Sequence, residues 1–140
     1  MNGSRPARRP RDDRGTATVF VVGMAVVLLA CAGLVIDGGK ALNARMKLAD
    51  DVEQAARLGA NQVDLVALRG SGVVSIDPAA AGAEAGGFLS GLGYSDIRVG
   101  VNDSSVTVGA SDTVPTALLQ LIGVGTFDIS ATATAQAVTQ

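Results

Sequence analysis

Few side chains of this chain are of the types that catalyse reactions or bind metals, and none has the spacing that such chemistry needs. The 140 residues include no histidine and a single cysteine, Cys31. The segment 33–40 (GLVIDGGK) has the glycines of a phosphate-binding loop. In that loop lysine is required where Gly39 stands, and alanine, not serine or threonine, follows Lys40. We therefore do not expect a nucleotide site there.

The acidic and hydroxyl side chains give no stronger candidates. Asp50, Asp51 and Glu53 are clustered, but neighbouring residues on a helix point about 100° apart. A solvated polar face is therefore expected in place of a calcium site. No serine has a neighbouring histidine or the Gly-x-Ser-x-Gly turn of a nucleophile. The sequence predicts no catalytic residue, no bound metal and no cofactor.

One acid has an unusual position, because Asp37 directly follows a long uncharged segment. Its carboxylate is expected to cap or hydrate a helix end. The alternative is that it contacts a basic group of a partner. Gly38 and Gly39 come next, and two glycines cost a helix about 2 kcal/mol relative to alanine. A kink or an unwound turn is expected at these three residues, which lie at the predicted membrane surface.

The uncharged segment 15–36 is long enough to cross a membrane. Its 22 residues would extend about 33 Å as a helix, against about 30 Å of hydrocarbon in a bilayer. Residues 1–14 hold five arginines and two aspartates, whereas residues 37–140 hold six basic and eleven acidic side chains. Because arginines beside a first span stay in the cytoplasm, we expect a cytoplasmic tail (1–14) and an extracytoplasmic C-terminal part.

Two other fates of the apolar segment are weighed against a retained helix. Cleavage as a secretory signal would use the small residues around Cys31, but apolar residues continue beyond it to Ile36. Lipidation would use Cys31 itself, since residues 28–31 (LLAC) are similar to a lipobox. A cysteine among apolar neighbours usually behaves as a small hydrophobic residue. A retained membrane helix is therefore preferred, with lipidation at Cys31 as an alternative.

Three motifs in order resemble the TadE/TadG-like proteins of tight-adherence (Flp) pilus systems. Residues 14–20 (RGTATVF) are similar to the start of the family's hydrophobic helix. Residues 34–40 (LVIDGGK) are similar to its Val-Asp-x-Gly-Arg segment, and residues 48–60 (LADDVEQAARLGA) to its Ala-Asp-x-Ala-Ala-x-Ala-Gly-Ala helix. The resemblance implies a pilin-like component that acts by assembly.

The resemblance also implies a processing site, between Gly15 and Thr16. Pilin leaders that are cut after glycine usually have glutamate at the fifth mature position, and here that position is Phe20. We therefore expect an uncleaved anchor in preference to a processed minor pilin.

The residues after the span are expected to continue as an amphipathic helix over 37–70. Apolar residues at steps of three and four predict a stripe that runs through Leu42 and Met46 and continues to Ala67. Its small members are candidate subunit contacts: Ala49, Val52, Ala56, Gly59 and Ala60. Packing of this helix on its own domain is the simpler expectation.

Residues 71–140 are expected to form a small α+β domain. Residues 73–76 are predicted as a strand, 79–92 as a helix capped by Asp77, and 97–110 as a hairpin. A short helix over 115–122 and a strand from residue 127 complete a β-α-β-β-α-β order, as in a ferredoxin-like sheet.

The span and the charges predict a single-pass cell-membrane protein, and the resemblance implies that it belongs to a bacterial pilus or a related type II/IV secretion apparatus. The expected partners are membrane lipid and other pilus or secretion-system subunits. Nucleic acid is not expected, because the basic block is only the short arm before the span. A lipidated or released binding module is the alternative function, and an enzyme is not expected.

Overall fold

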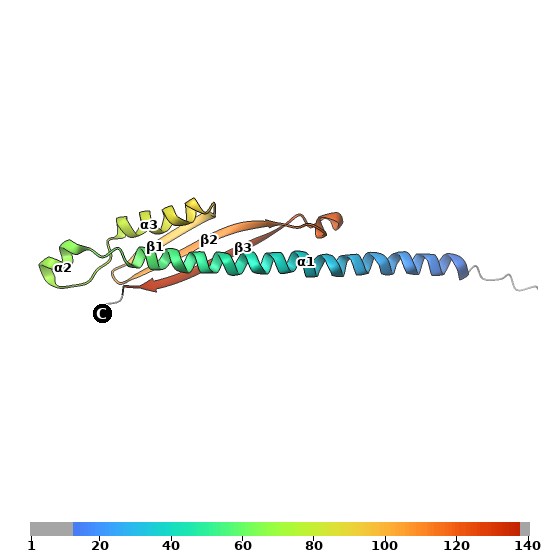
Figure 1. Cartoon of the computed structure of the whole chain (residues 1–140), viewed down its shortest axis with the longest axis horizontal. Coiled ribbons are helices and arrows are strands. Elements are labelled where there is room, and N and C mark those ends of the chain that lie inside the picture. The colour runs from blue at the N-terminus through green and yellow to red at the C-terminus, as the bar shows by residue number, and fades with distance from the viewer. Residues whose placement is uncertain (1–12, 138–140) are drawn as a thin grey trace, which may run out of the picture.

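The computed structural model describes residues 13–137 and shows an α+β chain built on one long helix (Figure 1). Three helices precede a three-stranded sheet, in the order α1 (Asp13–Ala60), α2 (Leu65–Ser71), α3 (Pro78–Gly91), β1 (Ser95–Asn102), β2 (Ser105–Pro115), the 3₁₀ helix η1 (Leu119–Ile122) and β3 (Thr126–Gln136). The predicted tail over residues 1–14 lies almost wholly outside the described residues.

Helix α1 is continuous, so the kink expected at 37–39 is wrong. Its 48 residues correspond to about 72 Å of helix. Gly38 and Gly39 stay helical although the glycines disfavour it, because tertiary contacts hold the helix on both sides, at Gly33 and Asp37 before them and from Leu48 after them. The C-terminal half of α1 packs on the rest of the chain, and much of the N-terminal half extends beyond it (Figure 1).

The sheet is an antiparallel meander with strand order β1-β2-β3. Asn102 pairs with Ser105 across a tight turn, which confirms the predicted hairpin. The β2–β3 pairing is longer and runs without a bulge from Ser105↔Gln136 to Pro115↔Thr126. The closed end of this second hairpin therefore extends past Ser95, the residue at which β1 begins.

The ferredoxin-like order is not confirmed, because residues 73–76 do not join the sheet. Ile76 forms only an isolated bridge with Val63. The backbone groups of this segment are bonded elsewhere: Ser75 accepts from the N–H of Asp64, and the N–H of Ile76 donates to Asp103. The segment therefore works as a connection between α2 and α3.

The helices α2 and α3 both begin at aspartate caps. The Asp77 carboxylate accepts from the N–H groups of Ala79 and Ala80, and Pro78 occupies the first turn. This confirms the predicted capped helix, with an end at Gly91. The Asp64 carboxylate caps α2 in the same way.

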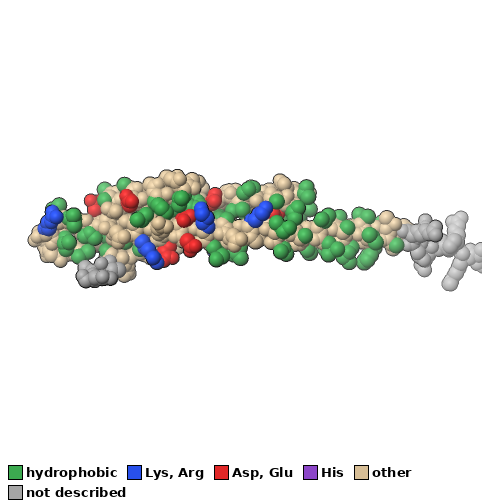
Figure 2. Space-filling model, in the orientation of Figure 1, with side chains coloured by type: hydrophobic (Ala, Val, Ile, Leu, Met, Phe, Trp, Pro, Cys, Tyr) green, Lys and Arg blue, Asp and Glu red, His purple; other side chains and the backbone are tan. Residues whose placement is uncertain are grey.

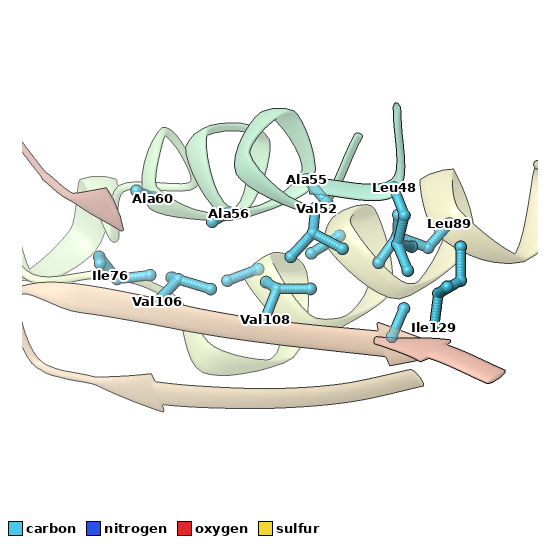
Figure 3. Close-up of a cluster of buried hydrophobic side chains, with 13 residues drawn as sticks. Leu48, Val52, Ala55, Ala56, Ala60, Ile76, Leu89, Val106, Val108 and Ile129 are labelled. Carbon is cyan, nitrogen blue, oxygen red and sulfur yellow. The ribbon is translucent and has the colours of Figure 1, made fainter. Parts of the chain in front are cut away.

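The core lies between one face of the sheet and the two helices α1 and α3 (Figure 3). Its largest fully buried side chains are Leu48, Val52, Leu89, Val106 and Val108. Alanines fill most of the remaining core, so the helices approach each other and the sheet closely. Gly59 marks the closest approach, since a Cβ there would lie 3.0 Å from Val106 and 3.3 Å from the Ala81 carbonyl oxygen.

The buried face of α1 agrees with the predicted stripe from Val52 to Ala60 but differs from it before Val52. Leu42 is 61% exposed and Met46 60%, whereas Ala41 and Ala44 are partly buried. The buried face follows steps of three and four through Ala30, Gly33, Asp37, Ala41, Ala44, Leu48, Val52, Ala55 and Gly59. At Gly33 the hairpin lies too close to α1 for a larger side chain, and alanines occupy the partly buried positions 41 and 44. The predicted stripe is also too long, because α1 ends at Ala60.

Candidate functional site

The most unusual site of the molecule is the junction where the end of the β2–β3 hairpin docks on the apolar half of α1. We call residues 115–126 the hairpin tip. Figure 1 shows the tip lying alongside α1, beyond the ends of β1 and α3. An apolar groove lies at this contact, and both elements line it: Val26, Leu29, Ala30, Leu118, Leu119, Leu121 and Ile122.

Asp37 ties the hairpin tip to α1 by three hydrogen bonds. The N–H of Ala117 donates to its carboxylate at 2.9 Å, and those of Leu118 and Leu119 each donate at 2.8 Å. The side chain is only 1% exposed. Asp37 therefore caps the start of η1 across 82 positions of sequence. The carboxylate contacts its own chain, as a cap, in this structure.

The local sequence of the tip explains why a distant cap is needed. The residue before η1 is Leu118, which has no side-chain hydrogen bond to offer. Thr116 is nearby, but its hydroxyl donates to the carbonyl oxygens of Val124 and Gly125 and so closes the base of the tip. The free N–H groups at the start of η1 are left for Asp37.

The same three donors set the charge state of Asp37. The N–H of Leu119, followed by those of Ala117 and Leu118, lowers the pKa of the carboxyl group below its usual 3.8. Burial opposes this shift, and the charge of Lys40 adds to it. The carboxylate is thus held ionised at neutral pH, which strengthens its hydrogen bonds.

Gly33 allows the tip to reach the helix. A Cβ at this position would lie 3.1 Å from the Cβ of Leu118 and 3.2 Å from a methyl carbon of Leu119. The glycine is buried although most neighbouring residues of the apolar segment are exposed. One turn of α1 therefore supplies both a gap for two leucines, at Gly33, and an acceptor for their N–H groups, at Asp37.

A second polar contact joins the other half of α1 to the start of the sheet. The Tyr94 hydroxyl donates to Asp51 at 2.6 Å, and the Lys47 ammonium lies 3.6 Å from the same carboxylate. Lys47 also lies 5.9 Å from the centroid of the Tyr94 ring. Partial burial and the hydrogen bond to Asp51 raise the pKa of Tyr94 to about 12.

The processing and lipidation candidates lie on the exposed surface of α1. Gly15 and Thr16 are in its first turns, and Cys31 is exposed within the apolar half. Cys31 lies two residues before Gly33, and its neighbours on both sides are helical.

The candidate subunit contacts are divided between the core and the surface. Val52, Ala56, Gly59 and Ala60 are buried by the chain's own α3 and sheet. Ala49 is exposed, on the same side of α1 as Leu42 and Met46 by helical spacing. Of this set, Ala49 is the residue that a neighbouring molecule can reach in the folded protein.

Sequence reasoning singled out Asp37 but missed its partner. The available signals were a lone acid at the end of an apolar segment and a helix start, at Leu119, without a local cap. Neither signal identifies the other across 80 residues, so the pairing needed the structure.

By its length and composition, α1 can cross a membrane. The family model described as "Putative Flp pilus-assembly TadE/G-like" matches residues 15–62, which end two residues after α1. No curated protein and no solved structure matches the chain significantly. The chain is thus similar to the TadE/G-like family model over residues 15–62, which confirms the resemblance found in the sequence.

Proposed function

We propose that the protein is an accessory, pilin-like membrane component of a tight-adherence pilus or a related secretion apparatus, and that it acts by binding other subunits. The observation that carries this proposal is the form of the TadE/G-like segment. It is one uninterrupted helix whose first half is apolar and exposed, and whose second half is packed into an α+β domain.

The proposed arrangement places residues 15–36 in the cell membrane as an uncleaved anchor. The arginines before the segment favour a cytoplasmic N-terminus and an extracytoplasmic sheet domain. The proposal predicts that the N-terminal residue of the membrane-bound protein precedes Thr16. A mature protein that begins at Thr16 would replace the anchor with a processed minor pilin.

The proposed subunit contact is the exposed apolar line of Leu42, Met46 and Ala49. These residues follow the span on the outward-facing half of α1, where a neighbouring membrane-anchored subunit can lie parallel to it. Their spacing of four and three residues keeps them on one side of the helix. They support no part of the chain's own core, which leaves them available to a neighbouring subunit.

The first experiment is deletion of the gene followed by complementation. We expect surface fibres, seen by electron microscopy, and surface adhesion to be lost or altered in the deletion strain and restored by the full chain. A released form containing residues 37–140 behind a cleavable export signal should not restore them. Normal fibres in the deletion strain would refute the proposal.

A matched pair of variants tests the contact surface. The double variant Leu42→Asp, Met46→Asp should abolish complementation while the protein remains folded and in the membrane. The control is Val66→Asp, which changes a more exposed apolar residue, on α2 at the end of the molecule far from the apolar half of α1 (Figure 1). Full complementation by the double variant would remove this line from the proposed contact.

The alternative of a lipidated binding module depends on Cys31. Lipidation there would require cleavage directly before Cys31, which would remove residues 15–30 and so most of the apolar segment. Membrane attachment and fibre formation that are unchanged in Cys31→Ala, with no lipid label on the native protein, would eliminate it. Labelling that disappears with this substitution would favour it.

A further inference from the structure

We infer that the hairpin tip is inserted into the outer half of the bilayer, where Leu121 and Ile122 contact lipid acyl chains. The inference rests on the proposed membrane anchor and adds a second membrane contact to it. The protein would then be held by a helix and by a re-entrant hairpin that lies against that helix.

The position of the tip along α1 carries the argument. The tip packs against Gly33, and the groove between the tip and α1 extends back to Val26, which precedes Asp37 by 11 residues, or about 16 Å of helix. The uncharged segment has only 22 residues, and about 20 are needed to cross the hydrocarbon. Arginines precede the segment and Asp37 follows it, so the bilayer cannot slide away from the tip.

The composition of the tip fits a hydrocarbon environment. No charged residue occurs between Asp112 and Asp128. Leu118 and Leu119 pack toward α1, whereas Leu121 is 80% exposed, Ile122 59% and Val124 38%. Figure 2 shows hydrophobic side chains gathered over the N-terminal half of α1 and the hairpin end beside it, while charged side chains lie over the other half.

The hydrogen bonding of the tip supports the same conclusion. An irregular segment is tolerated in hydrocarbon only where its polar backbone groups are satisfied within the protein. Asp37 accepts from the first N–H groups of the tip, and the N–H of Thr116 donates to Gly125. The N–H groups of Leu121, Gly123 and Val124 donate to carbonyl oxygens of the tip itself. The Gln120 amide donates to the Ala117 carbonyl oxygen.

The chain has no tryptophan, so a single introduced tryptophan reports its own surroundings. The full-length protein would be reconstituted in vesicles of phosphatidylcholine and phosphatidylglycerol, with or without bromine atoms on the acyl chains. The test variant is Leu121→Trp, and Ile122→Trp is its replicate. Val19→Trp marks the span, and Val73→Trp marks an exposed position between α2 and α3. Circular dichroism checks that each variant is folded.

Brominated chains should quench the fluorescence of Leu121→Trp and Ile122→Trp to the same degree as that of Val19→Trp, and leave Val73→Trp unchanged. Quenching of Val19→Trp without quenching of the two tip variants would overturn the inference and leave the anchor intact. Blue-shifted but unquenched tip variants would show that protein covers the tip, which also overturns it. An unquenched Val19→Trp would refute the membrane anchor and the inference together.

Discussion

At the scale of single residues, Tyr94 gives the most direct measurement, because it is the chain's one tyrosine and no tryptophan obscures it. Tyrosinate absorbance near 295 nm should report a pKa of about 12 for the folded protein. Removing the charge in Asp51→Asn should lower this pKa toward the ordinary value of 10.0. An unchanged titration would show that the Tyr94–Asp51 hydrogen bond is not formed.

The same shift fixes the direction of a stability effect. The pKa of Tyr94 is higher in the folded protein than its ordinary value, so its contribution to stability is complete below about pH 10. The contribution is lost as the pH rises through the folded pKa of about 12. Asp51→Asn should reduce the part of the alkaline stability loss that depends on this group.

Gly59 gives the second prediction at this scale. In Gly59→Ala the new methyl group would press on the Val106 side chain and on the backbone oxygen of Ala81, and the buried backbone cannot move away. We expect a loss of about 1–3 kcal/mol in the free energy of unfolding, as for other overpacked cores. Denaturant unfolding of the detergent-solubilised protein would measure it.

A matched control for Gly59 lies in α3. Gly87 is helical and exposed, and a Cβ there would meet nothing within 4 Å. Gly87→Ala should therefore stabilise the protein, by about 0.5–1 kcal/mol. Equal destabilisation by both substitutions would contradict the close packing described at Gly59.

At the scale of elements, the hairpin tip depends on a residue outside its own segment. In Asp37→Ala, hydrogen exchange followed by mass spectrometry should show faster exchange of residues 115–124, with little change in β1. Asp64→Ala, which removes the comparable cap of α2, should leave the tip protected. Slow exchange of the tip in Asp37→Ala would show that packing at Gly33 holds it without the carboxylate.

Acid should have the same effect as Asp37→Ala. The pKa of Asp37 is lowered in the folded protein, so its contribution is complete above the ordinary value of 3.8. It is lost as the pH falls through the lower folded pKa. The native tip should therefore open on acidification below about pH 4, and the tip of Asp37→Ala should show no such dependence.

The elements could be predicted from the sequence where local signals were sufficient. The capped helix after Asp77, the first hairpin and the strand β3 all have such signals in their own residues. Residues 73–76 have the apolar composition of a strand, but their backbone partners are in distant loops. The buried face of α1 before Val52 was also missed: the small Ala41 and Ala44 are partly buried there, whereas the larger Leu42 and Met46 are exposed.

At the scale of the whole molecule, α1 joins the apolar half to the sheet domain in one fixed rotation. Inserting one alanine after Gly39 would turn the preceding residues by about 100° relative to the domain. Gly33 and Asp37 would then face away from the tip, whose exchange should become fast while the sheet stays protected. The control Gly39→Ala adds a methyl group in open space and should keep the tip protected.

Helix α1 is continuous, and the hairpin tip is fixed to it at Gly33 and Asp37. A rotation of the apolar half of α1 is therefore transmitted to the sheet domain. If a neighbouring subunit binds one side of the apolar half of α1, that contact fixes the rotation of the sheet about the helix axis, and so the direction in which the uncovered face of the sheet points. Successive subunits that rotate about their spans would present their sheets at successive angles. The handedness of an assembly outside the membrane would then be set by contacts made within it.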